Sequence, residues 1–126
     1  MRECNFLRCK HCGNLVAMIH QSGVPVICCG EPMEELRANT VEASREKHIP
    51  VVSQDQHKVT ITVGSIDHPM LQEHYIEWIC LEKEMGFELK YLEPGQPPKV
   101  VFEFGEDNLI AVYAYCNLHG LWKKEI

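Results

Sequence analysis

Four cysteines near the start of the chain have the spacing of a metal site. Cys9 and Cys12 form a CxxC pair, and Cys28 and Cys29 follow as a vicinal pair. Two such pairs supply four thiolates, the tetrahedral ligand set that zinc or a single iron prefers. Spacing alone does not distinguish zinc from iron, because thiolates suit both metals. We expect His11 inside the CxxC pair to be exposed, since four thiolates already complete the shell.

The vicinal pair requires a bent backbone. Successive side chains in an extended strand point to opposite faces, so Cys28 and Cys29 reach one metal only through a turn. Gly30 and Pro32 supply turn-forming residues directly after the pair. We expect the sulfur–metal–sulfur angle at this pair to be distorted from tetrahedral.

A second set combines histidines with one thiol: His48, His68, His74, Cys116 and His119. Each lies in a loop or near the end of a predicted strand, where a rigid scaffold can direct ligands to one point. Cys116 and His119 form a CxxH pair that anchors the set. Four imidazoles and one thiolate leave an octahedral metal one open position, as a redox centre that binds its substrate requires. Zinc sites usually have three or four protein ligands, so iron fits this set better.

The other cysteines and histidines are not assigned to either set. Cys80 lies in an apolar strand, so we expect it to occupy a core position as a small hydrophobic residue. Trp122 follows the CxxH pair, and a core role is favoured over shielding of the metal. Three further residues have no supporting pattern: Cys4, His20 and His57.

Composition and charge narrow the classes of partner. The chain has 126 residues, of which 45% are hydrophobic and 24% charged, as in ordinary globular domains. Its net charge of −6 argues against nucleic acid or an anionic membrane as the main partner. No apolar run approaches the roughly 18 residues of a membrane-spanning helix, and the first residues lack a secretory signal pattern. We therefore expect a cytoplasmic protein whose seven cysteines remain thiols.

Two domains are expected. Residues 1–36 hold four clustered cysteines and few large apolar side chains, so a metal is expected to stabilise this small domain. Residues 37–126 form the second domain, which begins with a polar connector over residues 37–48. The remainder of this domain is rich in strand patterns.

The strand patterns of the second domain indicate an antiparallel sandwich. Val59, Ile61 and Val63 alternate with polar residues, which is the period of a half-buried strand. Residues 109–115 are apolar on both faces, as in a central strand. Two further inward rows are predicted, one of Phe87, Leu89 and Tyr91 and one of Val100, Phe102 and Phe104. Turn residues separate these short runs, which is typical of a mainly β sandwich.

Five motifs in order resemble a known family over essentially the whole chain. The CxxC pair with residues 28–33 resembles the desulforedoxin-type iron module. Residues 46–50, 68–70, 74–78 and 116–120 resemble the catalytic domain of superoxide reductases. Together they are similar to the desulfoferrodoxins, the superoxide reductases with two iron centres. The ordered set is far more specific than any one motif.

The resemblance implies two iron ions in each chain. The first is an FeS4 centre bound by Cys9, Cys12, Cys28 and Cys29. The second is an Fe(His)4(Cys) centre with His48, His68, His74 and His119 equatorial and Cys116 axial. The resemblance also implies an immunoglobulin-like sandwich for the second domain, and a homodimer.

The implied activity is the one-electron reduction of superoxide to hydrogen peroxide without release of dioxygen, which detoxifies an oxygen-derived radical. Lys47 is a candidate for attracting the anion and for ordering a proton-donating water. Glu46 resembles the family carboxylate that occupies the vacated position on oxidised iron. The expected electron donor is rubredoxin or a reductase.

Three alternatives remain open on the sequence. A zinc-stapled sandwich would have no catalytic activity. An electron carrier similar to desulforedoxin or rubredoxin would use the thiol centre and leave the histidine set unexplained. A superoxide dismutase would release dioxygen as well as peroxide.

Overall fold

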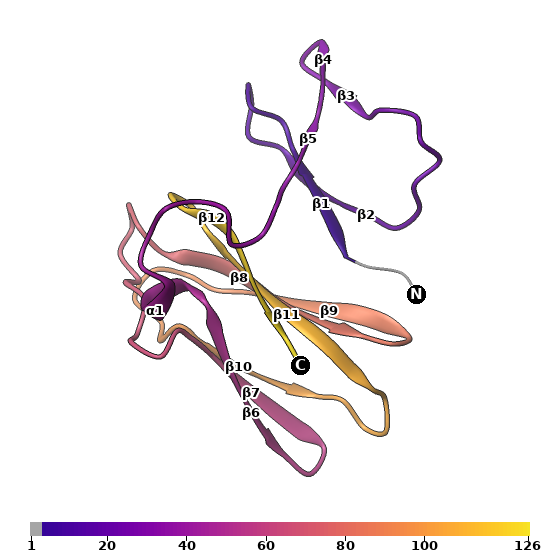
Figure 1. Ribbon diagram of the computed structural model, residues 1–126. Helices are drawn as coiled ribbons and strands as arrows, with labels where there is room; N and C mark the ends of the chain where they lie inside the picture. Colours follow the sequence, from indigo (N-terminus) through magenta and orange to yellow (C-terminus); the bar gives the residue numbers. More distant parts are fainter. Residues whose placement is uncertain (1–3) are drawn as a thin grey trace. The chain divides into compact units, whose positions relative to one another are not determined.

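The computed structural model describes residues 4–126, whose regular secondary structure is almost wholly antiparallel β-strand (Figure 1). Contacts within the chain divide it into two compact units, Met1–Arg37 and Ala38–Ile126, here called the N-terminal and C-terminal units. Among the described residues, no helix is both long and apolar enough to cross a membrane.

The N-terminal unit holds two small sheets. Its three-stranded sheet has the order β2-β1-β5, and a separate hairpin pairs β3 with β4. The strands are β1 (Asn5–Arg8), β2 (Leu15–Met18), β3 (Ile27–Cys28), β4 (Glu31–Pro32) and β5 (Glu34–Glu35). Among its described residues, only Phe6 and Cys9 are buried hydrophobic side chains. So little apolar burial does not stabilise a domain of this size alone, as the sequence predicted.

The bend expected at the vicinal cysteines is confirmed. Cys28 pairs with Glu31 across the β3–β4 hairpin, which leaves Cys29 and Gly30 as a two-residue loop. Both loop residues have positive φ, 51° and 77°. This is the pattern of a type I′ hairpin turn, in which glycine is strongly favoured.

The C-terminal unit is a sandwich of two antiparallel sheets. One has the order β10-β7-β6 and the other β12-β11-β8-β9. The strands are β6 (Pro50–Asp55), β7 (Lys58–Val63), β8 (Ile76–Lys83), β9 (Gly86–Tyr91), β10 (Lys99–Glu103), β11 (Leu109–Cys116) and β12 (Gly120–Glu125). This mainly β architecture confirms the predicted fold class.

The core of the C-terminal unit lies between the two sheets. Val59, Ile61 and Val63 on β7 are fully buried and alternate with less buried neighbours, as their period-two pattern predicted. Strand β11 lies between β12 and β8, and residues 111–116 are buried on both faces. Cys80 is also fully buried, as predicted, although it lies on the face of β8 that carries Trp78 and not in this core cluster.

The inward row predicted for Phe87, Leu89 and Tyr91 is wrong, although strand β9 forms as expected. Phe87 is 40% exposed and Tyr91 is 81% exposed. Strand β9 is the edge of its sheet, and its register places Tyr91 opposite Trp78 rather than opposite the core residue Ile79. Alternation identifies a strand, but it does not show which face is covered.

The polar connector predicted over residues 37–48 ends in one helical turn, α1 (Arg45–His48). The backbone N–H of Ile49 donates to the carbonyl of Arg45 at 2.9 Å and closes the turn. Ile49 itself is extended, with ψ at 123°, and Pro50 follows it. A residue before proline is disfavoured in the helical region, so the turn stops there.

Gly64, just after β7, allows the backbone of the α1 turn to approach closely. A Cβ atom at Gly64 would lie 2.5 Å from the carbonyl oxygen of Glu46 and 2.9 Å from that of Ile49. The same carbonyl of Glu46 accepts hydrogen bonds from Ile66 N at 3.0 Å and Ser65 Oγ at 3.2 Å. The turn that ends at His48 is therefore held against the loop after β7.

Gly64→Ala is expected to destabilise the protein by about 1–3 kcal/mol, because the added methyl group overlaps two backbone oxygens that cannot move independently. Chemical unfolding of the purified protein measures this change. Gly86→Ala is the matched control, since a Cβ there meets no atom within 4 Å. Equal unfolding free energies for the two variants would contradict the close approach.

Candidate metal centres

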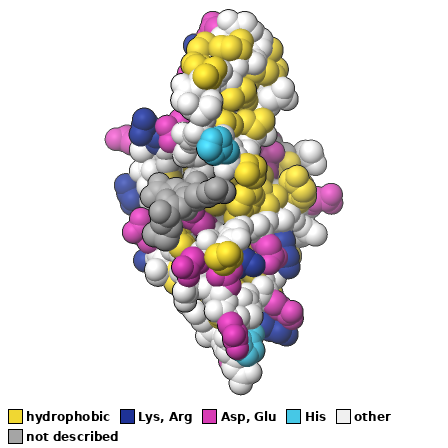
Figure 2. Space-filling view, turned by 90° about the vertical axis from the view of Figure 1, so that its right-hand side faces the viewer, with side chains coloured by type: hydrophobic (Ala, Val, Ile, Leu, Met, Phe, Trp, Pro, Cys, Tyr) yellow, Lys and Arg dark blue, Asp and Glu magenta, His cyan; other side chains and the backbone are white. Residues whose placement is uncertain are grey.

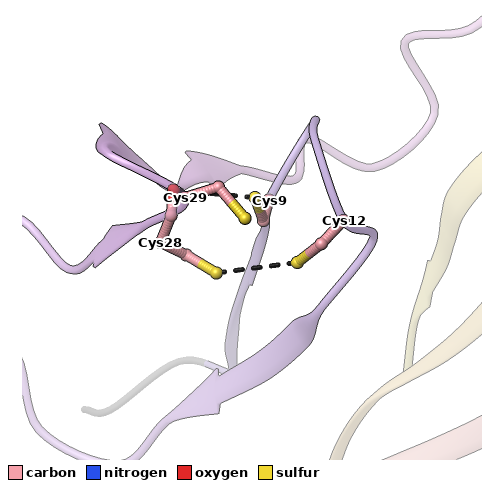
Figure 3. Close-up of side chains that lie close together, drawn as sticks. All are labelled: Cys9, Cys12, Cys28 and Cys29. Carbon is pink, nitrogen blue, oxygen red and sulfur yellow. Dashed lines mark hydrogen bonds between the residues drawn. The ribbon is translucent and has the colours of Figure 1, made fainter.

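The four cysteines of the N-terminal unit form one cluster of sulfur atoms. The Sγ atoms of Cys9, Cys12, Cys28 and Cys29 all lie within 4.8 Å of one another. Figure 3 shows that the CxxC pair and the vicinal pair come from two loops and direct their sulfurs toward a common point. The sulfurs of Cys12 and Cys28 lie 3.6 Å apart. Four thiols without other donors are the ligand set of tetrahedral zinc or iron.

Backbone and amide N–H groups surround these sulfurs. Asn14 donates its backbone N–H to the Cys12 sulfur at 3.5 Å and its side-chain Nδ2 to the Cys28 sulfur at 3.6 Å. The N–H of Gly13 donates to the Cys9 carbonyl at 2.9 Å and tightens the turn between the CxxC cysteines. N–H donors stabilise thiolates, so the two N–H groups of Asn14 favour negatively charged sulfurs at Cys12 and Cys28.

The thiols differ in how readily they ionise. The backbone N–H of Cys12 is the largest cause that lowers the pKa of Cys9 to about 6. A hydrogen bond with the Cys12 side chain is the largest cause that raises the pKa of Cys29 to about 12. The same partner raises the pKa of Cys28. A bound cation favours the deprotonated forms of Cys28 and Cys29, which fits a metal as the occupant.

Glu31 joins the two loops that carry the cysteine pairs. Its carboxylate lies 3.0 Å from Lys10 Nζ and 3.2 Å from His11 Nε2. Lys10 and His11 stand between the CxxC cysteines, whereas Glu31 follows the vicinal pair. His11 is exposed, as predicted, and its ring contacts this carboxylate rather than the sulfur cluster.

The second set gathers at one end of the sandwich. The start of β6 pairs with the end of β7, as Pro50 lies opposite Val63. The end of β11 pairs with the starts of β8 and β12, as Cys116 lies opposite Ile76 and Gly120. The loops at this end carry the histidines, so strand pairing brings distant parts of the sequence together.

The structure groups donor atoms of His48, His68, His74 and Cys116 within 4.8 Å of one another. His119 borders this group. Its Nδ1 lies 3.1 Å from His48 Nε2 and 3.8 Å from Cys116 Sγ. All five predicted donors therefore lie together, with His48 and His68 buried and His74 and His119 half-buried.

Two imidazoles in this set face each other through unprotonated nitrogens. His48 Nδ1 lies 2.6 Å from the Ser44 carbonyl, and His68 Nδ1 lies 2.7 Å from the Pro69 carbonyl. A carbonyl only accepts, so each Nδ1 carries the proton and each neutral ring leaves Nε2 with a lone pair. These two Nε2 atoms lie 3.1 Å apart. Facing lone pairs repel each other, and a metal ion bound by both nitrogens would remove this repulsion.

The remaining polar atoms support the same fit. Among the described residues, His74 Nε2 is buried and has no hydrogen-bond partner. Burial lowers the pKa of His68 to about 4 and also lowers the pKa of His48 and of His74. These rings are therefore neutral at pH 7, the state in which imidazole binds a metal.

Cys116 and Trp122 complete the interior of this centre. Burial raises the pKa of the Cys116 thiol, and the backbone N–H groups of His119 and Leu118 act in the opposite direction. The Trp122 ring lies 4.8 Å from the His48 ring, and its Nε1 donates to the His119 carbonyl at 3.2 Å. Trp122 is fully buried, so the predicted core role holds, and the same side chain also orients two histidines.

Glu46 and Lys47 lie on α1 directly before His48, and both are exposed. Neither side chain belongs to the two donor groups. The unassigned residues also lie elsewhere, since His20 is exposed and His57 bonds the Gly105 carbonyl at 3.0 Å. The sequence interpretation missed Asn14, which donates to two of the sulfurs, and Gly64 and Asn117, which contact the backbone beside the histidines. No residue pattern marks such contacts, although Asn117 does stand inside the CxxH pair.

On the face in Figure 2, acidic and basic side chains are interspersed, and hydrophobic side chains gather on the N-terminal unit. The exposed apolar residues of that unit include Ile19, Val24 and Ile27.

Comparisons with known proteins match both units. The family profile described as desulfoferrodoxin matches residues 40–125, and the profile of the desulfoferrodoxin N-terminal domain matches residues 1–36. The chain is 42% identical over 118 residues to a desulfoferrodoxin of Nitratidesulfovibrio vulgaris, covering 94% of this chain and 93% of that protein.

Named superoxide reductases are also similar. The crystal structure of the superoxide reductase from Treponema pallidum superposes with a TM-score of 0.82 at 39% identity, covering 98% of this chain and all of that one. A superoxide reductase of Thermococcus kodakarensis is 34% identical over 99 residues, covering 64% of this chain and 86% of that protein.

We expect two independent metal centres with separate spectra. Cys116→Ser removes the thiolate from the histidine centre, so its thiolate-to-metal absorption should disappear while the absorption of the four-thiolate centre remains. Absorption spectra of the iron-loaded protein measure both. Cys80→Ser is the matched control, since Cys80 is buried outside both donor groups, and should keep both spectra. Loss of both spectra in Cys116→Ser would contradict two separate sites.

Proposed function

The chain belongs to the desulfoferrodoxin family, and on that basis we propose that it is a superoxide reductase that converts superoxide to hydrogen peroxide without releasing dioxygen. The reaction consumes one electron and two protons for each superoxide. The observation that carries this proposal is the convergence of four imidazoles and one cysteine sulfur at one end of the sandwich. This ligand number leaves an octahedral iron one position for a small substrate.

Each donor set has its own proposed occupant. We assign His48, His68, His74, His119 and Cys116 to the catalytic iron, and Cys9, Cys12, Cys28 and Cys29 to the FeS4 iron. When bound, the catalytic iron supplies the electron and a coordination position for the anion. The carbonyls of Ser44 and Pro69 fix the rings of His48 and His68 with Nε2 directed inward. Neutral rings accept the metal without competition from a proton.

Lys47 is assigned the attraction of the substrate anion. The chain carries a net charge of −6, so superoxide has to be drawn by a local positive field. Burial is the largest cause that lowers the pKa of His48 and of His74, and the positive charge of Lys47 is a smaller cause in the same direction. The ammonium group therefore acts on the histidine centre while it remains exposed to solvent. An exposed ammonium also orders a water that can donate a proton.

Glu46 is assigned a role after oxidation, as the carboxylate that occupies the vacant position. Its backbone carbonyl is fixed by Ile66 and Ser65, whereas its side chain is exposed. The main chain beside His48 is thus held in place while the carboxylate stays at the surface. This arrangement supports a side chain that approaches the centre without displacing the ligand next to it.

Several further features belong to the same proposal. Residues 1–36 form the FeS4 domain and residues 37–126 form the catalytic domain. Electrons come from a small redox protein such as rubredoxin or from a reductase. The protein acts in the cytoplasm as a homodimer.

A pulse of superoxide on fully reduced, iron-loaded protein tests the reaction. We expect one catalytic iron to be oxidised for each superoxide, with formation of peroxide and no dioxygen. Stopped-flow absorption follows the iron, and product assays follow peroxide and dioxygen. Dioxygen release would indicate a dismutase instead. Iron that stays reduced would indicate a chain without this activity.

Lys47→Ala is expected to slow the encounter with superoxide by about two- to tenfold at low ionic strength, because a steering charge is lost. The dependence of the rate on salt should weaken as well. Pulse radiolysis at several salt concentrations measures both effects. Lys58→Ala is the matched control, as Lys58 is exposed at the start of β7, away from the donor loops. A Lys47→Ala rate equal to that of the control would contradict the assignment.

A further inference from the structure

The ladder between strands β8 and β11 ends beside the histidine centre. Cys116 pairs with Ile76, and a register shift lies between Tyr115 and Cys116. Beyond this point the two strands separate: β8 is preceded by the loop that carries His74, and β11 is followed by the turn that carries His119. Regular strand pairing therefore stops where two of the proposed ligands begin.

The side chain of Asn117 continues the pairing beyond this point. Its Oδ1 accepts from the Tyr75 N–H at 2.9 Å, and its Nδ2 donates to the Glu73 carbonyl at 3.0 Å. Its backbone N–H also donates to the Tyr75 carbonyl at 3.2 Å. A carboxamide offers one acceptor and a donor, as a peptide group does, so it replaces a strand partner. The residues on both sides of His74 are thereby bound to the residue after Cys116.

His74 is only half-buried, unlike His48 and His68. The rings of His48 and His68 are each oriented by a backbone carbonyl. His74 Nε2 has no hydrogen-bond partner among the described residues. A tight turn is the other feature of its loop, since Leu71 and His74 exchange backbone hydrogen bonds at 2.9 and 3.1 Å. The backbone around His74 is thus held both by this turn and by Asn117.

We propose that Asn117 is a positioning residue for the histidine centre, fixing the backbone around His74 to the turn that carries Cys116 and His119. The inference rests on the proposed function only in taking these three residues as ligands of one iron. Asn117 itself donates nothing to the metal. Asn117 acts by holding the His74 loop at a fixed distance from the turn that carries Cys116 and His119.

Two substitutions separate the hydrogen bonds. Asn117→Ala removes both side-chain contacts, whereas Asn117→Asp keeps the acceptor for Tyr75 N–H and loses the donor to Glu73. Asn108→Ala is the matched control, because Asn108 also bonds another loop, Nδ2 to Glu84 Oε2 at 2.6 Å. Asn108 precedes the opposite end of β11, so its loss should not reach the donors.

The test measures release of iron from reduced, fully loaded protein to a chelator, together with hydrogen–deuterium exchange over residues 72–76. For Asn117→Ala we expect release from the histidine centre to accelerate about tenfold or more, as for loss of other outer contacts to ligands. Exchange over residues 72–76 should also accelerate. Asn117→Asp should show a smaller effect on exchange, and Asn108→Ala should match the parent.

The four-thiolate centre serves as an internal reference in the same molecules. Selective loss at the histidine centre supports positioning, because general destabilisation would also change exchange throughout the sandwich. Unchanged release from Asn117→Ala would overturn the proposal, and so would accelerated exchange in every strand of both Asn117 variants. No superoxide is used, so the result is independent of whether the proposed reaction occurs.

Discussion

Two unprotonated imidazole nitrogens face each other 3.1 Å apart in the C-terminal unit, and a positive charge is needed beside them. Backbone carbonyls hold the protons of both rings on the opposite nitrogen. Burial disfavours the imidazolium form, so an added proton is a poor source of that charge. The fold therefore holds an electrostatic conflict that a metal ion resolves, and the other donors are arranged around it.

The facing nitrogens and the other donors stay close together because they come from the ends of paired strands. Antiparallel pairing brings the start of β8, the end of β11 and the start of β12 to one place. Close contacts then fix the irregular segments, as Gly64 does for the α1 turn and Trp122 for the ring of His48. The contacts that position the ligands are thus mostly made with the main chain, and the sheets provide the fixed frame.

Sequence reasoning succeeded where one residue type has few uses. The paired cysteines identified a four-thiol cluster, and the adjacent pair predicted its own turn. The five-donor set depended on the CxxH pair that anchors it, since single histidines have many other uses. The buried face of β9 was predicted wrongly because alternation does not reveal an edge strand. Asn14 and Asn117 were missed because a side-chain bond to a distant residue depends on which loops meet.

The two units differ in how much structure exists before a metal arrives. The sandwich has an extensive apolar core, so its donors are held in place by the fold. In the N-terminal unit, only Phe6 and Cys9 are buried hydrophobic residues among those described, so binding and ordering of the thiols are coupled. A preformed site selects its metal by geometry and ligand type. A segment that becomes ordered around its ion can accept any metal that binds four thiolates in tetrahedral geometry. The sandwich thus presents a donor set that its own core holds in place, whereas the order of the thiol cluster depends on the ion it binds.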